Sequence, residues 1–381
     1  MRETFDFSGL IDSAEQETVD VRMPFDQSRI DIVSQQISVF NVVARIRNAE
    51  INLTPEYQRN TDLWHDSEQS RLIESLILGI PLQSFYFDVR IVQGEQGLQR
   101  QVWDVVDGLQ RLSSLRSYLI DGKRFKGLEY LSEYDGKRYD ELPRILQRNI
   151  LEAQLYVNLI RSGTPEEVKF NIFKRVNTGG LPLTQQEIRH ALFGGRGMRF
   201  VADLAASKEF RAATSKRVGQ KRLLNQEYVN RFLAFYLLDV DDSYRTLDTF
   251  MNDALRIVNS KPDADLDEIR RVFFHSLSVI HAVLGDRAFV RYDVKRQSWS
   301  KKINKAIFEV LTVQVARLTD AEREILRTCP TFVDDYRRLF ESESDVPFTA
   351  TISSSTDAKA RIQSRHAVMR EFLRNELEVS L

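Results

Sequence analysis

The chain has 381 residues, of which 42% are hydrophobic, so it can form one large domain or two ordinary domains with a full core. Its formal net charge is −1, which excludes a global positive field that would recruit nucleic acid. The single cysteine excludes an intramolecular disulfide and a cysteine-rich zinc site.

Residues 1–35 are acidic and weakly periodic, which predicts a mobile arm or one that docks lightly. Apolar residues then recur with helical spacing from 37 to 46 and from 72 to 77, which predicts two helices. The second helix should begin near Asp66, a good N-cap residue, and end at Gly79.

A strand pair is expected next. Apolar and polar residues alternate strictly over 83–92, and a glycine-bearing turn leads to a return strand over 101–106. The return strand ends at Asp107, and Gly108 leads into a helix. Because the start of a helix leaves backbone N–H groups unpaired and Arg111 adds a forked cation, this junction suits an anion. An ordinary strand–turn–helix junction with a surface arginine is the simpler interpretation of the local sequence.

The following segments predict a strand at 155–159 and a helix that Thr164 caps. Thr184 and Glu187 have the spacing of a capping box, which predicts a further helix. Glycines between 194 and 197 mark the clearest boundary in the chain.

Beyond this boundary the strand pattern disappears, and apolar stripes with helical spacing continue to the C-terminus. We therefore expect an α+β chain in three parts: an arm over 1–35, an α/β domain over 36–195 and an all-helical domain over 196–381.

The sequence pattern carries no targeting or membrane signal. The N-terminus is acidic and lacks the apolar core that a signal peptide needs. No apolar run approaches the length of a membrane-spanning helix. We therefore expect a cytoplasmic protein with no membrane partner.

Three motifs in the first half resemble one family when they are taken together. They are Tyr-Gln-Arg at 57–59, Asp-Gly-Leu-Gln-Arg-Leu at 107–112 and Phe-Lys-Arg-Val-Asn-Thr-Gly-Gly at 173–180. In this order they are similar to the N-terminal domain of GmrSD-type restriction systems, which carries a DGQQR signature. Leu109 replaces the first glutamine of that signature.

The resemblance implies a ParB/sulfiredoxin-like fold for 36–195, in which the Asp-Gly-x-Gln-Arg turn contacts nucleotide phosphates. Proteins with related folds bind and hydrolyse CTP, as ParB does, or use ATP, as sulfiredoxin does. The resemblance also implies a nucleoside triphosphatase that controls a nuclease in defence against phage or other foreign DNA. Magnesium with a nucleoside triphosphate is the cofactor that such chemistry would use.

Triphosphate hydrolysis requires cations on the phosphates, an acid that bridges a metal ion and a group that orients water. Arg111 can fork onto phosphate oxygens, Asp107 can hold magnesium and Gln110 can orient the attacking water, so these three are the catalytic candidates. The candidates for nucleotide binding come from all three motifs and are Gln58, Arg59, Gly108, Arg175, Asn177 and Thr178.

Ordinary structural roles compete with several of these assignments. Glu187 suits the capping partner of Thr184 better than a metal ligand. Asn177 with Gly179 can form a left-handed helix end, and Arg59 can be a solvated surface side chain.

The sequence contains no recognisable nuclease or P-loop motif. Relatives often carry a His-Asn-His nuclease domain after the N-terminal half, but none of the five histidines here pairs with a nearby acid in a ββα pattern. No Walker-type Gly-x-x-x-x-Gly-Lys-Ser/Thr sequence occurs. We therefore predict no nuclease activity in this chain.

Two basic segments, 211–222 and 287–305, are weak candidates for nucleic-acid contact. The second has Tyr292 and Trp299 among its cations, and such aromatic residues can stack bases while cations follow a phosphate backbone. A solvated surface is the simpler interpretation of both. The candidate side chains are Lys216, Arg217, Lys221, Arg222, Lys295, Arg296, Lys301 and Lys302.

The sequence therefore predicts a nucleotide-binding regulator, and a candidate triphosphatase, in a system that defends against foreign DNA. Two alternatives stay open: a non-enzymatic DNA- or protein-binding module with the same fold and, ranked last, a cryptic nuclease. The expected partners are a nucleoside triphosphate, DNA, and a separate nuclease or other defence subunit. The choice of nucleotide and assembly into a homo-oligomer also stay open.

Overall fold

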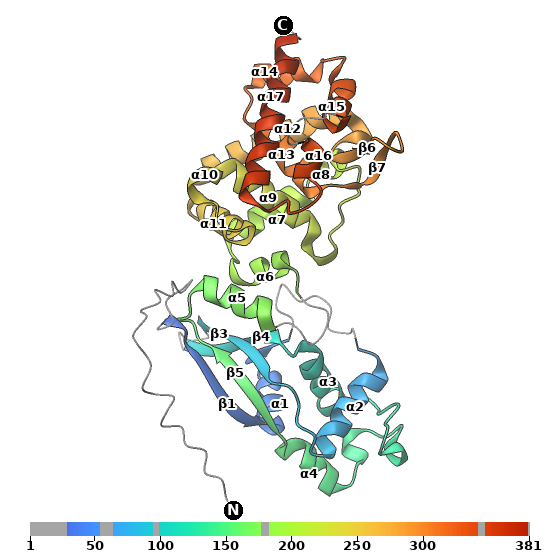
Figure 1. Cartoon of the computed structure of the whole chain (residues 1–381). Helices are drawn as coiled ribbons and strands as arrows, with labels where there is room; N and C mark the ends of the chain where they lie inside the picture. The colour runs from blue at the N-terminus through green and yellow to red at the C-terminus, as the bar shows by residue number, and fades with distance from the viewer. Residues whose placement is uncertain (1–28, 54–63, 94–98, 177–182, 342–346, 380–381) are drawn as a thin grey trace, which may run out of the picture.

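The computed structural model describes residues 29–53, 64–93, 99–176, 183–341 and 347–379, which form two lobes (Figure 1). The lower lobe in Figure 1, the sheet lobe, holds a mixed sheet with helices, and the upper lobe, the helical lobe, consists mainly of helices. None of the helices in the described ranges is both long enough and apolar enough to span a bilayer.

The sheet of the sheet lobe has the strand order β1-β5-β3-β4-β2. Its strands are β1 (Ile32–Ser38), β2 (Ile51–Asn52), β3 (Phe85–Gln93), β4 (Gln99–Asp107) and β5 (Gln154–Ile160). Strand β1 is antiparallel to β5, β3 is parallel to β5 and antiparallel to β4, and β2 is parallel to β4. Residues 32–35, which the sequence places in the expected arm, are part of β1 and pair with β5.

Four helices cover one face of the sheet and bury its apolar side chains. They are α1 (Val39–Arg47), α2 (Asp66–Ile77), α3 (Leu109–Leu119) and α4 (Arg144–Glu152), with short 3₁₀ turns η4 (Ser132–Tyr134) and η5 (Tyr139–Glu141) before α4. The alternation predicted over β3 is confirmed, because Phe85, Phe87 and Val89 all lie in this first core. Trp103 and Val105 of β4 join them from the neighbouring strand.

The opposite face of the sheet carries charged side chains beneath α5 (Glu166–Val176). Lys169 of α5 forms an ion pair with Asp88 of β3, and both side chains are buried. Asp104 of β4, which lies opposite Asp88, pairs with Arg90. Burial raises the pKa of Asp88, and the Lys169 ammonium opposes that rise.

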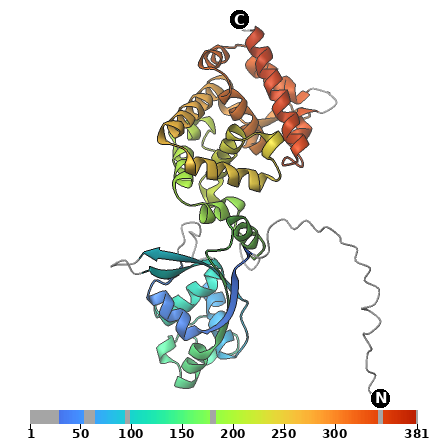
Figure 2. The same cartoon turned by 90° about the vertical axis from the view of Figure 1, so that its left-hand side faces the viewer.

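Helices α5 and α6 (Gln185–Leu192) connect the sheet lobe to the helical lobe, and they are drawn in green between the two lobes in Figure 2. Phe170 and Phe173 of α5 and Ile188 of α6 belong to the same buried cluster as the helical lobe. The outer face of the sheet is therefore covered by helices that pack into this second core.

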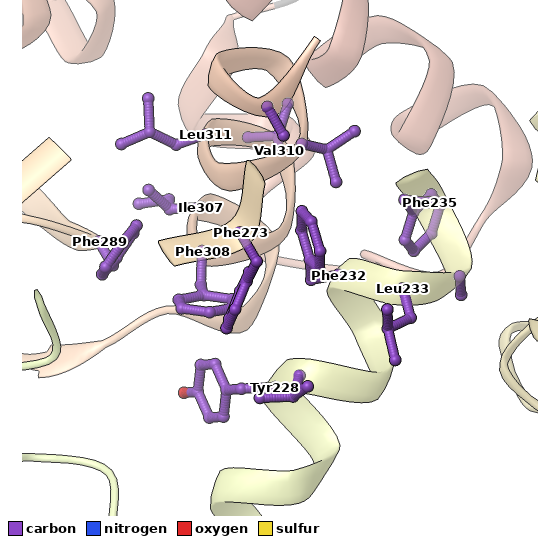
Figure 3. Packing of buried hydrophobic residues seen from close by; sticks show 14 of the residues in the cluster. Tyr228, Phe232, Leu233, Phe235, Phe273, Phe289, Ile307, Phe308, Val310 and Leu311 are labelled. Atoms are coloured by element: carbon purple, nitrogen blue, oxygen red, sulfur yellow. The ribbon is translucent and has the colours of Figure 1, made fainter. Parts of the chain in front are cut away.

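The helical lobe contains α7 (Arg196–Ala206), α8 (Lys208–Ala213), η6 (Lys221–Leu223), α9 (Leu224–Leu237), α10 (Val240–Ser243), α11 (Leu247–Ser260), α12 (Asp263–Leu284), η7 (Gly285–Arg287), α13 (Lys305–Ala316), α14 (Asp320–Arg327), α15 (Phe332–Glu341), α16 (Phe348–Thr351) and α17 (Lys359–Val379). Aromatic side chains of α9 pack against α12 and α13 at its centre (Figure 3). The ring centroids of Tyr228 and Phe308 are 5.1 Å apart, and those of Phe232 and Phe273 are 4.5 Å apart.

One element contradicts the expectation of an all-helical second half. Strands β6 (Val290–Asp293) and β7 (Ser298–Ile303) form an antiparallel hairpin. Its strands are short and carry several exposed cations, so the alternation of buried residues is weak in the sequence. The inward face of the hairpin is recognised only from its tertiary contacts: Trp299 packs against Tyr292 and against Tyr336.

A group of charged side chains is buried in the helical lobe around Glu309 of α13. Arg231 Nε and Arg365 Nη2 approach its carboxylate at 2.8 and 2.6 Å, and His366 Nε2 lies at 3.2 Å. Burial alone would raise the pKa of Glu309, but Arg365 and Arg231 outweigh it and lower that pKa to about 2. These residues hold α9, α13 and α17 together.

Candidate functional site

The junction between β4 and α3, here called the elbow (residues 107–111), has a backbone that requires glycine. Gly108 has φ of +101°, a region that other residues rarely adopt. A Cβ atom at this position would also collide with the ring of Phe85. Gly108 is the N-cap residue of α3, and it makes no side-chain hydrogen bond to the first turn of that helix. The glycine of the motif therefore allows the chain to turn from the buried strand β4 into α3.

Arg111 lies on the first turn of α3 and turns back onto the elbow. Its Nη2 lies 2.8 Å from Oδ2 of Asp107, in an ion pair whose side chains are only 10% and 16% exposed. It also donates to the backbone carbonyl oxygens of Gln83 and Ser84, which precede β3. Its guanidinium lies over the Phe85 ring, 4.4 Å from the centroid. The Arg111 guanidinium thus contacts a carboxylate, two backbone carbonyl groups and an aromatic ring of the protein itself.

Burial acts on both members of this ion pair. It raises the pKa of Asp107, and Arg111 together with the N–H of Gly108 opposes that rise. Burial lowers the pKa of the Arg111 guanidinium, and Asp107 opposes that fall. The Asp107 carboxylate and the Arg111 guanidinium therefore each stabilise the charged form of the other against the cost of burial.

The chain flanking the other two motifs leads to the same side of the sheet. Strand β2 is parallel to β4, so residue 53 leaves the sheet in the direction in which Asp107 does. In Figure 1, α5 crosses the sheet toward the end where α3 begins.

The structure brings together four of the predicted residues: Asp107, Gly108, Gln110 and Arg111. Gln110 is half-buried, and its backbone carbonyl accepts a hydrogen bond from Ser114 Oγ at 2.8 Å. Arg175 is exposed on the last turn of α5. The remaining predicted nucleotide contacts, Gln58, Arg59, Asn177 and Thr178, lie outside the described residues.

Glu187 is the capping partner of Thr184, as the sequence favoured. The Thr184 N–H donates to Glu187 Oε2 at 2.7 Å, and the Glu187 N–H donates to Thr184 Oγ1 at 3.2 Å. Arg222 also reaches the Glu187 carboxylate at 2.9 Å. This pairing neutralises one of the cations predicted to contact nucleic acid.

The other predicted basic residues divide between the two segments. Arg217 is held by Asp286, whereas Lys216 and Lys221 are exposed and have no ion pair within the described part of the chain. The cations of the hairpin are exposed. They are Lys295, Arg296, Lys301 and Lys302, of which Arg296 lies 3.9 Å from Asp293. Tyr292 is buried and Trp299 is half-buried, and Trp299 packs against both Tyr292 and Tyr336.

Sequence reasoning missed two features that only three-dimensional proximity creates. One is the buried pair of Lys169 and Asp88, which lie on a helix and a strand far apart in the chain. The other is a basic pocket in the helical lobe, to which the sequence pointed only through its cations at 211–222. In the described ranges, no three His, Cys, Asp or Glu side chains gather as a metal-binding group.

One comparison with known proteins identifies the region that contains the elbow. Residues 40–194 match the model of the family described as GmrSD restriction endonuclease, N-terminal domain. The matched range includes all three motifs and ends after α6. The chain has no match among the curated proteins.

Proposed function

We propose that this chain, whose residues 40–194 are a GmrSD-type N-terminal domain, is a regulatory component of a restriction or anti-phage defence system that binds a nucleoside triphosphate at the elbow. The observation that supports the proposal is the Asp107–Arg111 pair at the uncapped start of α3. A helix N-terminus with an adjacent arginine favours a phosphate group.

Binding requires an exchange of partners at Arg111. A phosphate oxygen takes the place of the Asp107 carboxylate on Nη2, while Nη1 keeps its bond to the Gln83 carbonyl. The guanidinium remains stacked on Phe85, so its plane stays oriented. This exchange replaces one anion with another and leaves no buried cation unpaired.

The exchange leaves the Asp107 carboxylate next to the phosphates. One carboxylate together with phosphate oxygens is a ligand set that suits Mg²⁺. The ion would neutralise phosphate charge when it is bound. Gln110, in the same turn, is proposed to orient water, and Gln58, Arg59, Arg175, Asn177 and Thr178 are proposed to supply further nucleotide contacts from the flanking motifs.

Calorimetric titration and phosphate release with ATP, CTP, GTP and UTP, each with magnesium, test this proposal. We expect at least one triphosphate to bind and Arg111→Ala to weaken binding at least about tenfold. Because Arg111 also supports the fold, Gln110→Ala is the second variant; it should retain binding and lose turnover. If no triphosphate binds the intact chain, the proposal is wrong.

A second candidate is a non-enzymatic module that retains the fold without turnover. It is favoured by the contacts of Arg111 with Asp107, Gln83 and Ser84, which by themselves give this side chain a structural role. Triphosphate binding without phosphate release, in the presence and absence of DNA, would support a switch of this kind. A cryptic nuclease ranks last.

We further propose that DNA cleavage in such a system belongs to a separate nuclease subunit. Two histidines of the helical lobe have structural surroundings: His366 contacts the buried Glu309, and His275 lies between Asp320 and Glu324. The purified chain should therefore not cleave DNA with magnesium. Cleavage that Asp107→Ala abolishes would instead support the nuclease alternative.

A further inference from the structure

A basic pocket of about 630 Å³ opens in the helical lobe, in the segment that links α7 to α9. Lys208 and Arg211 of α8 and Lys216 of the following loop line it, and none of the described residues in its lining is acidic. The elbow lies in the other lobe (Figure 1), so this pocket is separate from the proposed triphosphate site.

The three cations of the pocket are available to a ligand. Among the described residues, their closest approach to a carboxylate is 4.0 Å, between Lys208 and Glu209, and Lys208 is 88% exposed. Arg211 and Lys216 are exposed and form no ion pair within the described ranges. Arg211 uses its Nε to donate to the Ser207 carbonyl, which orients its guanidinium. A concave surface with three such cations attracts an anion more strongly than scattered surface lysines do.

The loop that carries Lys216 has an unusual backbone that is held in place. Ser215 and Lys216 have φ of 49° and 56°, and Arg222 and Leu223 follow with 56° and 57°. Non-glycine residues in this region cost free energy and gather at functional sites. Ser215 Oγ donates to Asp286 at 2.6 Å, which fixes the loop against η7. The position of Lys216 at the pocket is therefore set by the fold.

The remaining lining fits more than a simple phosphate ion. Ala212 and Val218 provide an apolar wall. Asn225, at the start of α9, is 5% exposed, and its Nδ2 donates to the Ala205 carbonyl. Its Oδ1 is buried and has no hydrogen-bond partner within the described part of the chain. Cations beside an apolar wall match the phosphate and the sugar or base face of a nucleotide.

We propose that this pocket binds one nucleotide unit through its phosphate, with Lys208, Arg211 and Lys216 on the phosphate and the rest of the unit against Ala212 and Val218. The volume falls in the range of small-ligand sites and far exceeds the needs of inorganic phosphate. The unit is a free nucleotide or a nucleotide of a DNA strand, since both present the same chemistry. The inference does not rest on triphosphate binding at the elbow.

The test compares two variants that lose the same charge. The pocket variant carries Lys208→Ala, Arg211→Ala and Lys216→Asn, where asparagine tolerates the left-handed backbone. The control variant carries Lys126→Ala, Lys137→Ala and Arg144→Ala, which remove three exposed cations of the sheet lobe. Binding of a labelled single-stranded oligonucleotide and of nucleoside mono- and triphosphates is measured with the full chain. A metal chelator and an Arg111→Ala background keep the elbow from contributing.

We expect the pocket variant to lose at least tenfold in affinity, and the control variant to remain near the parent. For an oligonucleotide, loss of the contacts to one phosphate should reduce the salt dependence of affinity by about 0.7 logarithmic units per decade of salt. Binding of free nucleotides alone would assign the pocket to them, and binding of the oligonucleotide alone would assign it to a strand. Equal losses in both variants, or no binding by any probe to the parent chain, would overturn the proposal.

Discussion

Lys169 of α5 and Asp88 of β3 form a buried ion pair across the outer face of the sheet. The pair connects the sheet lobe to a helix whose apolar side chains belong to the core of the helical lobe. The pair therefore lies between the helical lobe and the strand next to β4, which ends at the elbow.

Removing one member of this pair should destabilise the chain strongly. Lys169→Met leaves the Asp88 carboxylate buried without its closest cation, which we expect to lower the free energy of unfolding by about 3 kcal/mol. Arg148→Met, which breaks the exposed pair with Glu152, should cost less than about 0.5 kcal/mol. Urea unfolding measures both. Similar losses from the two substitutions would contradict a buried, energetically important pair.

Gly108→Ala should destabilise the sheet lobe because both the backbone and the space around it exclude a methyl group. We expect a loss of about 2 kcal/mol or more from the positive φ and the collision with Phe85. Gly136 is the matched control, because its φ is +79° and no heavy atom would lie within 4 Å of an added Cβ. Gly136→Ala should therefore cost only about 1 kcal/mol in the same thermal unfolding experiment.

Glu309 should make stability depend on acid pH. Its folded-state pKa of about 2 lies below the ordinary value of 4.5, so the unfolded chain binds the proton more readily. The stabilisation is fully present above pH 4.5 and is lost as the pH falls from 4.5 toward 2, amounting to about 3 kcal/mol. Glu309→Gln should flatten the pH dependence of stability in this window while lowering stability at pH 7. An unchanged pH profile in that variant would show that other carboxylates govern acid unfolding.

Trp299 should act in folding and not in ligand binding. It stacks on Tyr336 and packs edge-on against Phe340, so Trp299→Ala should lower the free energy of unfolding by about 2 kcal/mol or more. Lys301→Ala on the same strand is exposed and should change stability by no more than about 0.5 kcal/mol. If Trp299→Ala instead left stability intact and weakened oligonucleotide binding, base stacking by this hairpin would be supported.

The local sequence determined the elements that have one buried face and a clear start or end. Strands predicted at 83–92, 101–106 and 155–159 correspond to β3, β4 and β5, and the helix predicted after Asp66 is α2. Capping side chains also act within a few residues, so the Thr184–Glu187 box could be predicted from spacing alone. The match of residues 40–194 to the GmrSD N-terminal domain could likewise be predicted from three short motifs in order.

Only the tertiary structure decided what these elements contact. The sequence predicted that Asp107 and Arg111 lie at one turn, but it could not show that the guanidinium bonds to Asp107 and the chain before β3. It likewise could not predict β1 pairing with β5, the inward face of the β6–β7 hairpin or the gathering of Lys208, Arg211 and Lys216 around one pocket. Apolar periodicity and helix caps reflect interactions between residues that are close in the sequence. The partners of a cation and the walls of a pocket depend on residues that only folding brings together.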